Sequence, residues 1–270
     1  MKNFILVVVI VAVAAYIFLV IKKNRESSVP QYVEQAVTLG PKQAEPEPQP
    51  PPVKYPVTPA QPEEEQTPPP APEPLPPLDE SDEALFNGLI ALSGNIQWRE
   101  LFQPAVLVRR FVVTVDNMTA DKLPQKYRVT LPLPGSFLIQ KTGEDRLNIA
   151  ADNYARYEVY VNLVESIDLK KMVALYRRYY PLFQQAYEDL GYPGRYFNDR
   201  LIEVIDHLLA APEIKGPITL KQPKVYYVFA DPELEALSAG QKVMVRIGAH
   251  NAARVKTRLR ELRNLLTGNN

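Results

Sequence analysis

Proline is concentrated in one stretch of this chain, where it rules out regular helix and sheet. Seventeen of the 27 prolines fall between Pro30 and Pro77. Proline fixes φ and lacks an amide hydrogen, so a run this dense favours a solvated polyproline II backbone. The same stretch carries seven Glu against two Lys. Residues 22–77 are therefore predicted to form a disordered, proline-rich tether.

An uncharged apolar segment precedes the tether. After a short flank, residues 1–3, residues 4–21 read FILVVVIVAVAAYIFLVI. A helix of this length spans ~27 Å, close to the ~30 Å of bilayer hydrocarbon. The pattern Ala12-Val13-Ala14 would suit cleavage of a secretory signal. Because apolar residues continue beyond it, we predict a retained single-pass transmembrane helix.

The side of the membrane on which the domain lies follows less directly from the sequence. Lys22, Lys23 and Arg25 slightly outnumber the positive charges before the helix, which favours a cytoplasmic domain. A long stiff spacer suits a domain that works far from its membrane, as in a bacterial periplasm. We predict an inner-membrane protein with a periplasmic domain, and a cytoplasmic domain is the alternative.

Residues 78–270 are predicted to fold as one mainly α domain with a minor β hairpin. Between residues 127 and 149, prolines and glycines separate short apolar pieces, which indicates a loop and the hairpin. Residues 224–229 indicate a further short strand. Apolar residues at helical spacing predict helices over residues 82–92, 107–115, 168–191, 199–209 and 238–266.

Three of these helices carry specific expectations. The β-branched run Val112–Val115 keeps a strand possible in the second helix. Pro181 is expected to kink or split the third. The last helix opens with Ser238-x-x-Gln241, a capping-box pattern, and is expected to continue to about Leu266.

Composition excludes several chemistries. The chain has no cysteine and only two histidines, so disulfides, thiolate nucleophiles and cysteine- or histidine-rich metal sites are absent. It also lacks phosphate-binding glycine loops and a nucleophile elbow. We expect no metal and no cofactor. An enzyme stays possible but is not favoured.

The densest polar region runs from Tyr192 to His207. Asp199, Glu203 and His207 lie there at spacings that place an imidazole beside carboxylates on one helix, as a general acid and base require. These are the candidate catalytic residues of a hydrolase. The competing interpretation is an ordinary helix start, in which Asn198 or Asp199 caps the helix and Arg200 pairs with Glu203.

The same region offers a docking surface. Arg195, Tyr196, Asn198 and Arg200 combine an aromatic ring with donors that suit a glycan or a peptide partner. Tyrosines upstream, from Tyr176 to Tyr187, have the spacing of core residues, so packing accounts for them as well.

A third candidate is the basic C-terminal helix. Lys256, Arg260 and Arg263 lie on one face, which could bind nucleic acid or anionic lipid. These bases could equally pair with acids of the same domain. Nucleic-acid binding is therefore not favoured.

Four stretches of the domain resemble a bacterial envelope family, the domain-of-unknown-function 3014 family. They are RRFVVTVDN (109–117), ALYRRYYPLFQQAYEDLGYP (174–193), YFNDRLIEVIDHLL (196–209) and QPKVYYVFADPELEALSAGQK (222–242). The resemblance implies a membrane anchor, a proline-rich spacer and a single domain. It carries no activity or catalytic residue.

The leading hypothesis is a tethered, non-enzymatic binding or scaffold module on the inner membrane. Its partner would be an envelope protein or a cell-wall component. One alternative is a periplasmic hydrolase or wall-modifying enzyme that uses the acid–base residues. The other is a cytoplasm-facing binder of nucleic acid or anionic lipid that uses the basic helix.

Overall fold

The computed structural model describes residues 51–57, 74–93, 102, 105–124, 126, 129–131, 135–143 and 146–268. A short 3-10 turn, η2 (Leu78–Glu80), leads into the first described helix. The helices are α2 (Asp82–Ser93), α4 (Leu107–Asn117), α5 (Ala151–Ala155), α6 (Glu158–Glu165), α7 (Leu169–Asp189), α8 (Phe197–Leu209), α9 (Pro232–Glu235), α10 (Ala239–Arg246) and α11 (Ala249–Thr267). The strands are β1 (Ile139–Thr142), β2 (Arg146–Ile149), β3 (Thr219–Lys221) and β4 (Val228–Phe229).

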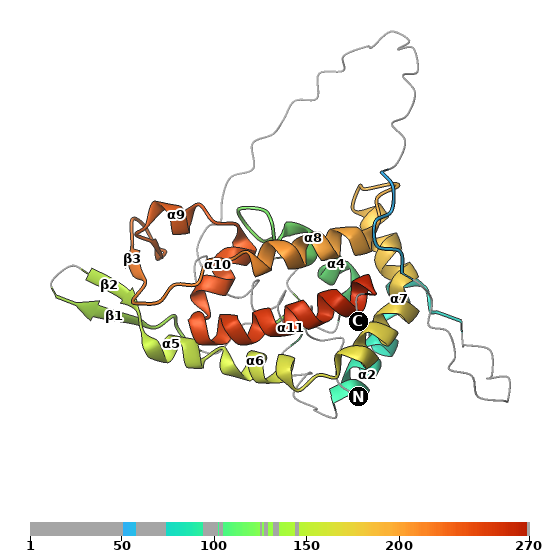
Figure 1. Cartoon of the computed structure of the whole chain (residues 1–270), viewed down its shortest axis with the longest axis horizontal. Coiled ribbons are helices and arrows are strands. Elements are labelled where there is room, and N and C mark those ends of the chain that lie inside the picture. The colour runs from blue at the N-terminus through green and yellow to red at the C-terminus, as the bar shows by residue number, and fades with distance from the viewer. Residues whose placement is uncertain are drawn as a thin grey trace, which may run out of the picture.

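The helices form a bundle with the small sheet at the end opposite α7 (Figure 1). Helix α4 packs on both α7 and α8, and α11 packs on α6, α7 and α8. Aromatic rings fill the centre of the bundle. Phe111 meets Phe183 edge-to-face at a centroid distance of 5.3 Å, and Phe183 stacks on Phe197 at 6.1 Å. Such pairs hold the helices at fixed angles.

The valine run of α4 is helical rather than a strand. Leu107, Val108, Phe111, Val112 and Val115 form one apolar face, and each is at most 1% exposed. Burial of that face outweighs the lower helix propensity of the valines, which is only a fraction of a kcal/mol per residue.

Helix α7 runs unbroken through Pro181, so the expected split does not occur. Its start is capped as a helix start should be, because the Asp168 carboxylate accepts from the amides of Lys170 and Lys171 at 3.1 and 3.3 Å. Pro181 itself is exposed, while Tyr180 and Leu182 beside it are buried. Water can therefore reach the carbonyl that loses its partner, and packing on both sides keeps the helix intact.

The predicted hairpin is present, and it belongs to a larger sheet. Strands β1 and β2 pair antiparallel, and β3 and β4 extend them to a four-stranded antiparallel sheet of order β1-β2-β3-β4. The sheet covers a second, smaller core around Phe229 and Val245. The guanidinium of Arg246 lies 4.9 Å from the centroid of the Phe229 ring, a cation–π contact that closes this core.

The C-terminal helix is two helices, which corrects the expectation of one continuous helix from Ser238. The Ser238 cap is as predicted, since its Oγ accepts from the Gln241 amide at 3.2 Å. Gly248, however, has φ 86° and ψ 155°, and its backbone lies against the Tyr154 ring. Only glycine fits a positive φ this close to a ring, so α10 ends there and α11 begins.

Among the described residues, no helix is both long and apolar enough to cross a bilayer. The predicted anchor, residues 4–21, lies outside the described residues, as does much of the predicted tether.

Candidate functional site

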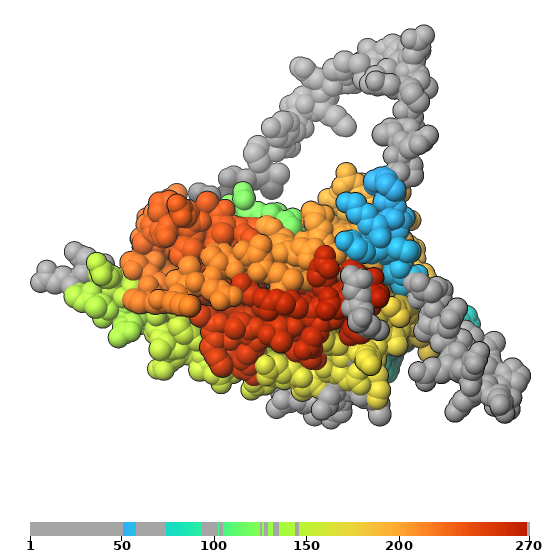
Figure 2. Space-filling view, in the orientation of Figure 1, coloured from blue at the N-terminus to red at the C-terminus, as the bar shows by residue number. Residues whose placement is uncertain are grey.

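Residues 51–57 lie against the domain at the start of α8, within the stretch that composition predicts to be disordered. We call them the docked segment. Figure 2 shows them in blue, over α8 and beside the end of α11. For these seven residues the structure differs from the prediction, because the domain supplies partners for their backbone.

Three side chains at the start of α8, the α8 site, make those bonds. The Asp199 carboxylate accepts from the amides of Lys54 and Tyr55, at 2.9 and 2.8 Å. Asn198 Nδ2 donates to the Tyr55 carbonyl at 2.9 Å. The hydroxyl of Tyr196 accepts from the Val57 amide at 2.7 Å. The α8 site thus binds backbone amide and carbonyl groups of the docked segment.

The geometry at Asp199 requires a bend in its ligand. In an extended chain, successive amides point in opposite directions. Here Lys54 and Tyr55 form a bend, and both amides point to one carboxylate. Bonds to a charged acceptor are stronger than neutral ones. The helix N-terminus also favours a negative charge at this position.

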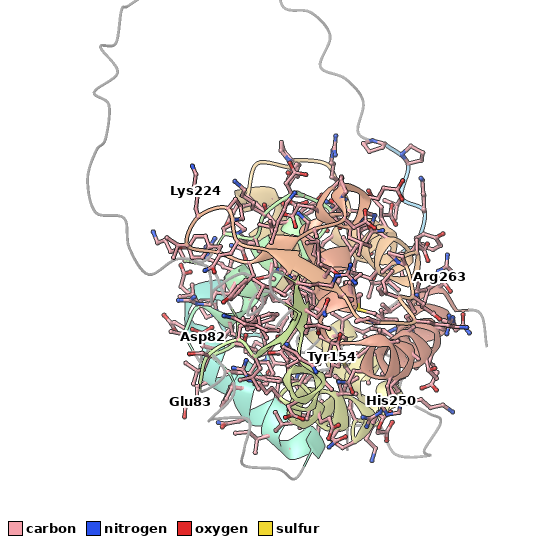
Figure 3. The ribbon with its side chains drawn as sticks, turned by 90° about the vertical axis from the view of Figure 1, so that its left-hand side faces the viewer. Asp82, Glu83, Tyr154, Lys224, His250 and Arg263 are labelled. Carbon is pink, nitrogen blue, oxygen red and sulfur yellow. The ribbon has the colours of Figure 1, made fainter. Side chains whose placement is uncertain are left out.

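Apolar contacts accompany the polar ones. Tyr55 and Val57 are partly buried against the main core, as is Leu75 where the chain rejoins the domain. Arg263 of α11 is influenced electrostatically by Tyr55 and binds the Asp206 carboxylate through two nitrogens, at 2.5 and 3.0 Å. Figure 3 labels Arg263 on the side of the molecule where the segment runs.

A buried hydrogen-bond network supports the α8 site from below. Asn198 is fully buried, and its Oδ1 accepts from the Tyr176 hydroxyl at 3.2 Å. The Asn198 amide donates to the Tyr180 hydroxyl, which donates to Gln184 Oε1 at 2.9 Å. Burial raises the pKa of Tyr176 and of Tyr180 well above the ordinary value. Both hydroxyls therefore stay protonated and fix the orientation of Asn198.

Neither Asn198 nor Asp199 caps α8, which corrects the expected helix start. Tyr196 occupies the N-cap position without a capping side-chain bond. Gln184 of α7 takes that role, since its Oε1 accepts from the Phe197 amide at 2.9 Å. This leaves the Asn198 and Asp199 side chains free to bind the docked segment.

The two arginines proposed for partner binding point elsewhere. Arg200 is directed toward the end of α4, where Nε donates to Asp116 Oδ1 at 2.9 Å and Nη2 donates to Thr119 Oγ1 at 2.7 Å. The guanidinium of Arg195 lies 5.6 Å from the Tyr192 ring centroid. Of the four predicted docking residues, the structure brings Tyr196 and Asn198 to the docked segment, together with Asp199.

The three candidate catalytic residues have separate partners. Asp199 binds the docked segment. Glu203 is exposed and pairs with Arg200 at 2.8 Å. The Nε2 of His207 lies 2.7 Å from Ser238 Oγ. The structure therefore does not unite them in one acid–base site.

The pair of His207 and Ser238 has the distance of a base and a nucleophile, but its hydroxyl is already engaged. Ser238 Oγ caps α10, and Ser238 is only 8% exposed between α8 and α10. Burial, together with the charge of Arg200, lowers the pKa of His207, and Glu203 opposes this shift. A neutral imidazole accepting from the Ser238 hydroxyl fits that environment.

This pKa shift predicts acid sensitivity. Because the folded pKa of His207 lies below the unfolded value of about 6.5, the unfolded state binds more protons as the pH falls through that value. His207 therefore contributes stability that is present above about pH 6.5 and is lost on acidification. The melting temperatures of wild type and His207→Gln should differ more at pH 7.5 than at pH 5. A constant gap for His207→Gln would refute the assignment.

The basic face of α11 is largely neutralised within the domain. Lys256 is buried and donates to the Ala211 carbonyl and to Glu213, at 2.7 and 3.1 Å. Arg263 binds Asp206, as described above. Arg260 has no bond to another described residue. The interpretation as internal ion pairs thus holds for two of the three residues.

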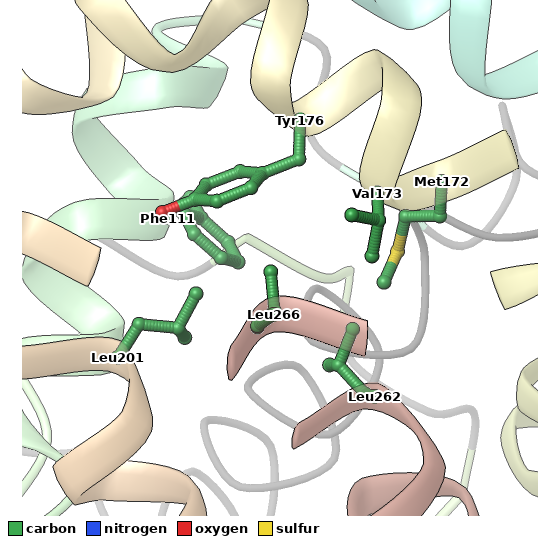
Figure 4. Close-up of a pocket in the computed structure, with 7 residues that line it drawn as sticks. All are labelled: Phe111, Met172, Val173, Tyr176, Leu201, Leu262 and Leu266. Carbon is green, nitrogen blue, oxygen red and sulfur yellow. The ribbon is translucent and has the colours of Figure 1, made fainter. Parts of the chain in front are cut away.

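Two hollows of the described structure lack the features of a reaction site. An apolar cavity of about 10 Å³ lies between α4, α7, α8 and α11, about the size of one water (Figure 4). A shallow hollow of about 450 Å³ lies between the start of α7 and the end of α11. Three of its charged side chains are engaged, since Asp168 caps α7 and Arg258 bonds Glu261. Within the described parts of the chain, no three His, Asp or Glu side chains come together as metal ligands would.

Comparison with known proteins identifies the family of this chain but assigns it no activity. No curated protein and no solved structure matches this chain. The model of a family described as proteins of unknown function (DUF3014) matches residues 107–263, from the start of α4 to Arg263. This range is more than half of the chain and contains the α8 site, while the docked segment lies outside it. The chain therefore belongs to the DUF3014 family.

Proposed function

We propose that this protein is a membrane-anchored binding module of the cell envelope, whose α8 site receives a short proline-containing segment of a partner protein. The observation that carries this proposal is the docked segment, whose backbone makes four hydrogen bonds to Tyr196, Asn198 and Asp199. A site built for main chain is suited to peptides rather than to bond cleavage.

The contacts specify the chemistry of the ligand. It needs free amides at the positions of Lys54, Tyr55 and Val57, and a carbonyl at Tyr55. Position 56 donates no bond, so proline is accepted there and lowers the entropy lost on binding. The side chains of Tyr55 and Val57 supply the buried apolar area. The partner segment thus has the form aromatic-proline-aliphatic.

An occupant covers the polar groups of the site. The docked segment covers Asn198 and supplies the acceptor of its Nδ2. When the segment leaves, this donor and the Asp199 carboxylate must bind water or a second segment. The chain's own segment and a partner's segment can therefore occupy the same groups.

The location of the module is the second part of the proposal. The uncharged residues 4–21 would hold it in the inner membrane, and the proline-rich tether would carry the domain into the periplasm. In the cysteine-free chain, Ser28→Cys and Gly268→Cys give unique labelling sites. Both should react with an impermeant maleimide in intact cells, and labelling only after lysis would place the domain in the cytoplasm.

Peptide binding tests the site directly. The host is the full chain carrying Val57→Pro, which removes the amide that donates to the Tyr196 hydroxyl and so weakens the docked segment's hold on the site. The probe is a fluorescent peptide with the sequence of residues 50–58, PPPVKYPVT. Fluorescence anisotropy should show saturable binding to this host.

Adding Asp199→Asn to the host should weaken peptide binding at least tenfold. The variant replaces an acceptor of two amides by a group with one acceptor and one donor, and bonds to charged groups contribute ~1.5–3 kcal/mol each. Glu203→Gln is the matched control, because Glu203 lies one turn further along α8 and pairs with Arg200 rather than with the amides of Lys54 and Tyr55. Its affinity should match the host's. No saturable binding, or equal affinity with Asp199→Asn, would refute the proposal.

A further inference from the structure

The docked segment closes a loop in the chain. It ends at Val57, and the described chain resumes at Pro74, with Leu75 packed on the core. Sixteen residues, 58–73, connect these points. While the segment is docked, the chain leading toward the predicted anchor leaves the domain at Pro51. When it is free, that chain leaves at Pro74. Release therefore adds residues 51–73 to the free tether, or ~70 Å of contour at about 3.1 Å per residue.

The interactions of the segment suit reversible release. They consist of four backbone bonds and two partly buried side chains. Closing a loop costs entropy that grows only with the logarithm of its length, so a sixteen-residue connection permits docking. A segment linked in this way acts at an effective concentration in the millimolar range. Another segment that makes the same bonds would compete with it.

Arg263 and Asp206 set the far edge of this arrangement. The pair lies on the last turns of α11 and α8, and Arg263 also interacts electrostatically with Tyr55. A partner segment with an aromatic residue at the position of Tyr55 can therefore replace each contact without any change in the domain.

We propose that the docked segment is a releasable latch, and that a partner's aromatic-proline-aliphatic segment displaces it and lengthens the tether. This inference rests on the proposed function, since it assigns a consequence to occupancy of the same site. Binding of the partner and the length of the free tether are then coupled in one equilibrium. A domain that has found its partner is held less closely to its anchor than one that has not.

The experiment uses the full chain in nanodiscs, with a donor and an acceptor dye on Ser28→Cys and Lys141→Cys. Lys141 is exposed on β1, at the end of the molecule away from the α8 site. Unlabelled PPPVKYPVT peptide at saturation should lower the energy transfer between the dyes. With Val57→Pro added, transfer should already be low, and the peptide should change it little. Val53→Pro adds a proline at an exposed residue whose amide bonds no described residue, and should behave as the parent chain.

A parallel anisotropy titration separates the two proposals. The labelled peptide should bind the Val57→Pro chain at least tenfold more tightly than the parent chain, because the weakened latch competes less. If the peptide binds both chains equally and energy transfer does not change, the latch is refuted while the binding site stands. If the peptide binds neither chain, the proposed function itself fails.

Discussion

Replacing Arg200 with alanine should lower the free energy of unfolding by about 3 kcal/mol. The Arg200 and Asp116 side chains are only 16% and 13% exposed. Arg200 also bonds the Asp116 carbonyl at 2.6 Å and Thr119 Oγ1 at 2.7 Å, and so joins α8 to the end of α4. Alanine would leave the Asp116 carboxylate with the Tyr192 hydroxyl as its partner. Removing one partner of a buried ion pair typically costs about 3–5 kcal/mol, and the partial exposure here favours the lower end.

Urea denaturation of the full chain measures this effect, and two variants control for it. Arg200→Lys keeps the charge without the planar fork, so its loss should be intermediate. Glu203→Gln removes the exposed partner, whose side chain is 64% exposed, and should cost less than about 1 kcal/mol. If Arg200→Ala costs no more than Glu203→Gln, the link between α4 and α8 does not stabilise the fold.

Gly248→Ala should be the other strongly destabilising change, with a loss of at least about 3 kcal/mol. Gly248 has φ 86° and ψ 155°, a region that is essentially restricted to glycine and costs other residues about 1–3 kcal/mol. A Cβ at this position would also lie 2.7 Å from Tyr154 Cδ1. Cγ of the same ring would lie at 2.8 Å, so relief of the clash would require the Tyr154 side chain or the backbone at residue 248 to move.

Gly268→Ala separates the two causes. Gly268 also has a positive φ, 74°, but a Cβ there would meet nothing within 4 Å. Its loss should be about 1 kcal/mol, the cost of the left-handed conformation alone. Thermal melting of both variants checks the comparison. Equal losses at the two positions would show that contact with Tyr154 contributes nothing.

The main helices of this fold can be predicted from sequence because each has an apolar face at regular spacing. Such a face predicts α4, α7 and α8 to within a few residues, and Asp168 and Ser238 mark two helix starts by their capping chemistry. The break at Gly248 cannot be predicted in this way. It depends on the Tyr154 ring, which is distant in sequence and close only in the fold. The short strand predicted over residues 224–229 is present as the two residues of β4, whereas the three residues of β3 give too little pattern to assign.

The candidate site is predictable in part. The sequence singles out Tyr196, Asn198 and Asp199 by their density of polar and aromatic groups, and the structure brings all three to the docked segment. The roles expected for Arg195 and Arg200 differ, since their positions are set by Tyr192 and Asp116. The segment itself gives no signal, because its bonds are made by backbone atoms that every residue carries. Its prolines correctly exclude helix and sheet, yet they leave docking undecided.

The position of the docked segment determines how the molecule would respond to mechanical load. A force that pulls residues 1–50 away from the domain reaches Lys54 and Tyr55 first, and then Val57. Their bonds to the start of α8 take this load one after another, and the chain that follows Val57 takes it only after those bonds have broken. The contacts of the docked segment are thus weak and reversible, and they would break before the core unfolds. A pulling force would extend the molecule before it could unfold the domain, and the docked segment would bind again when the force fell.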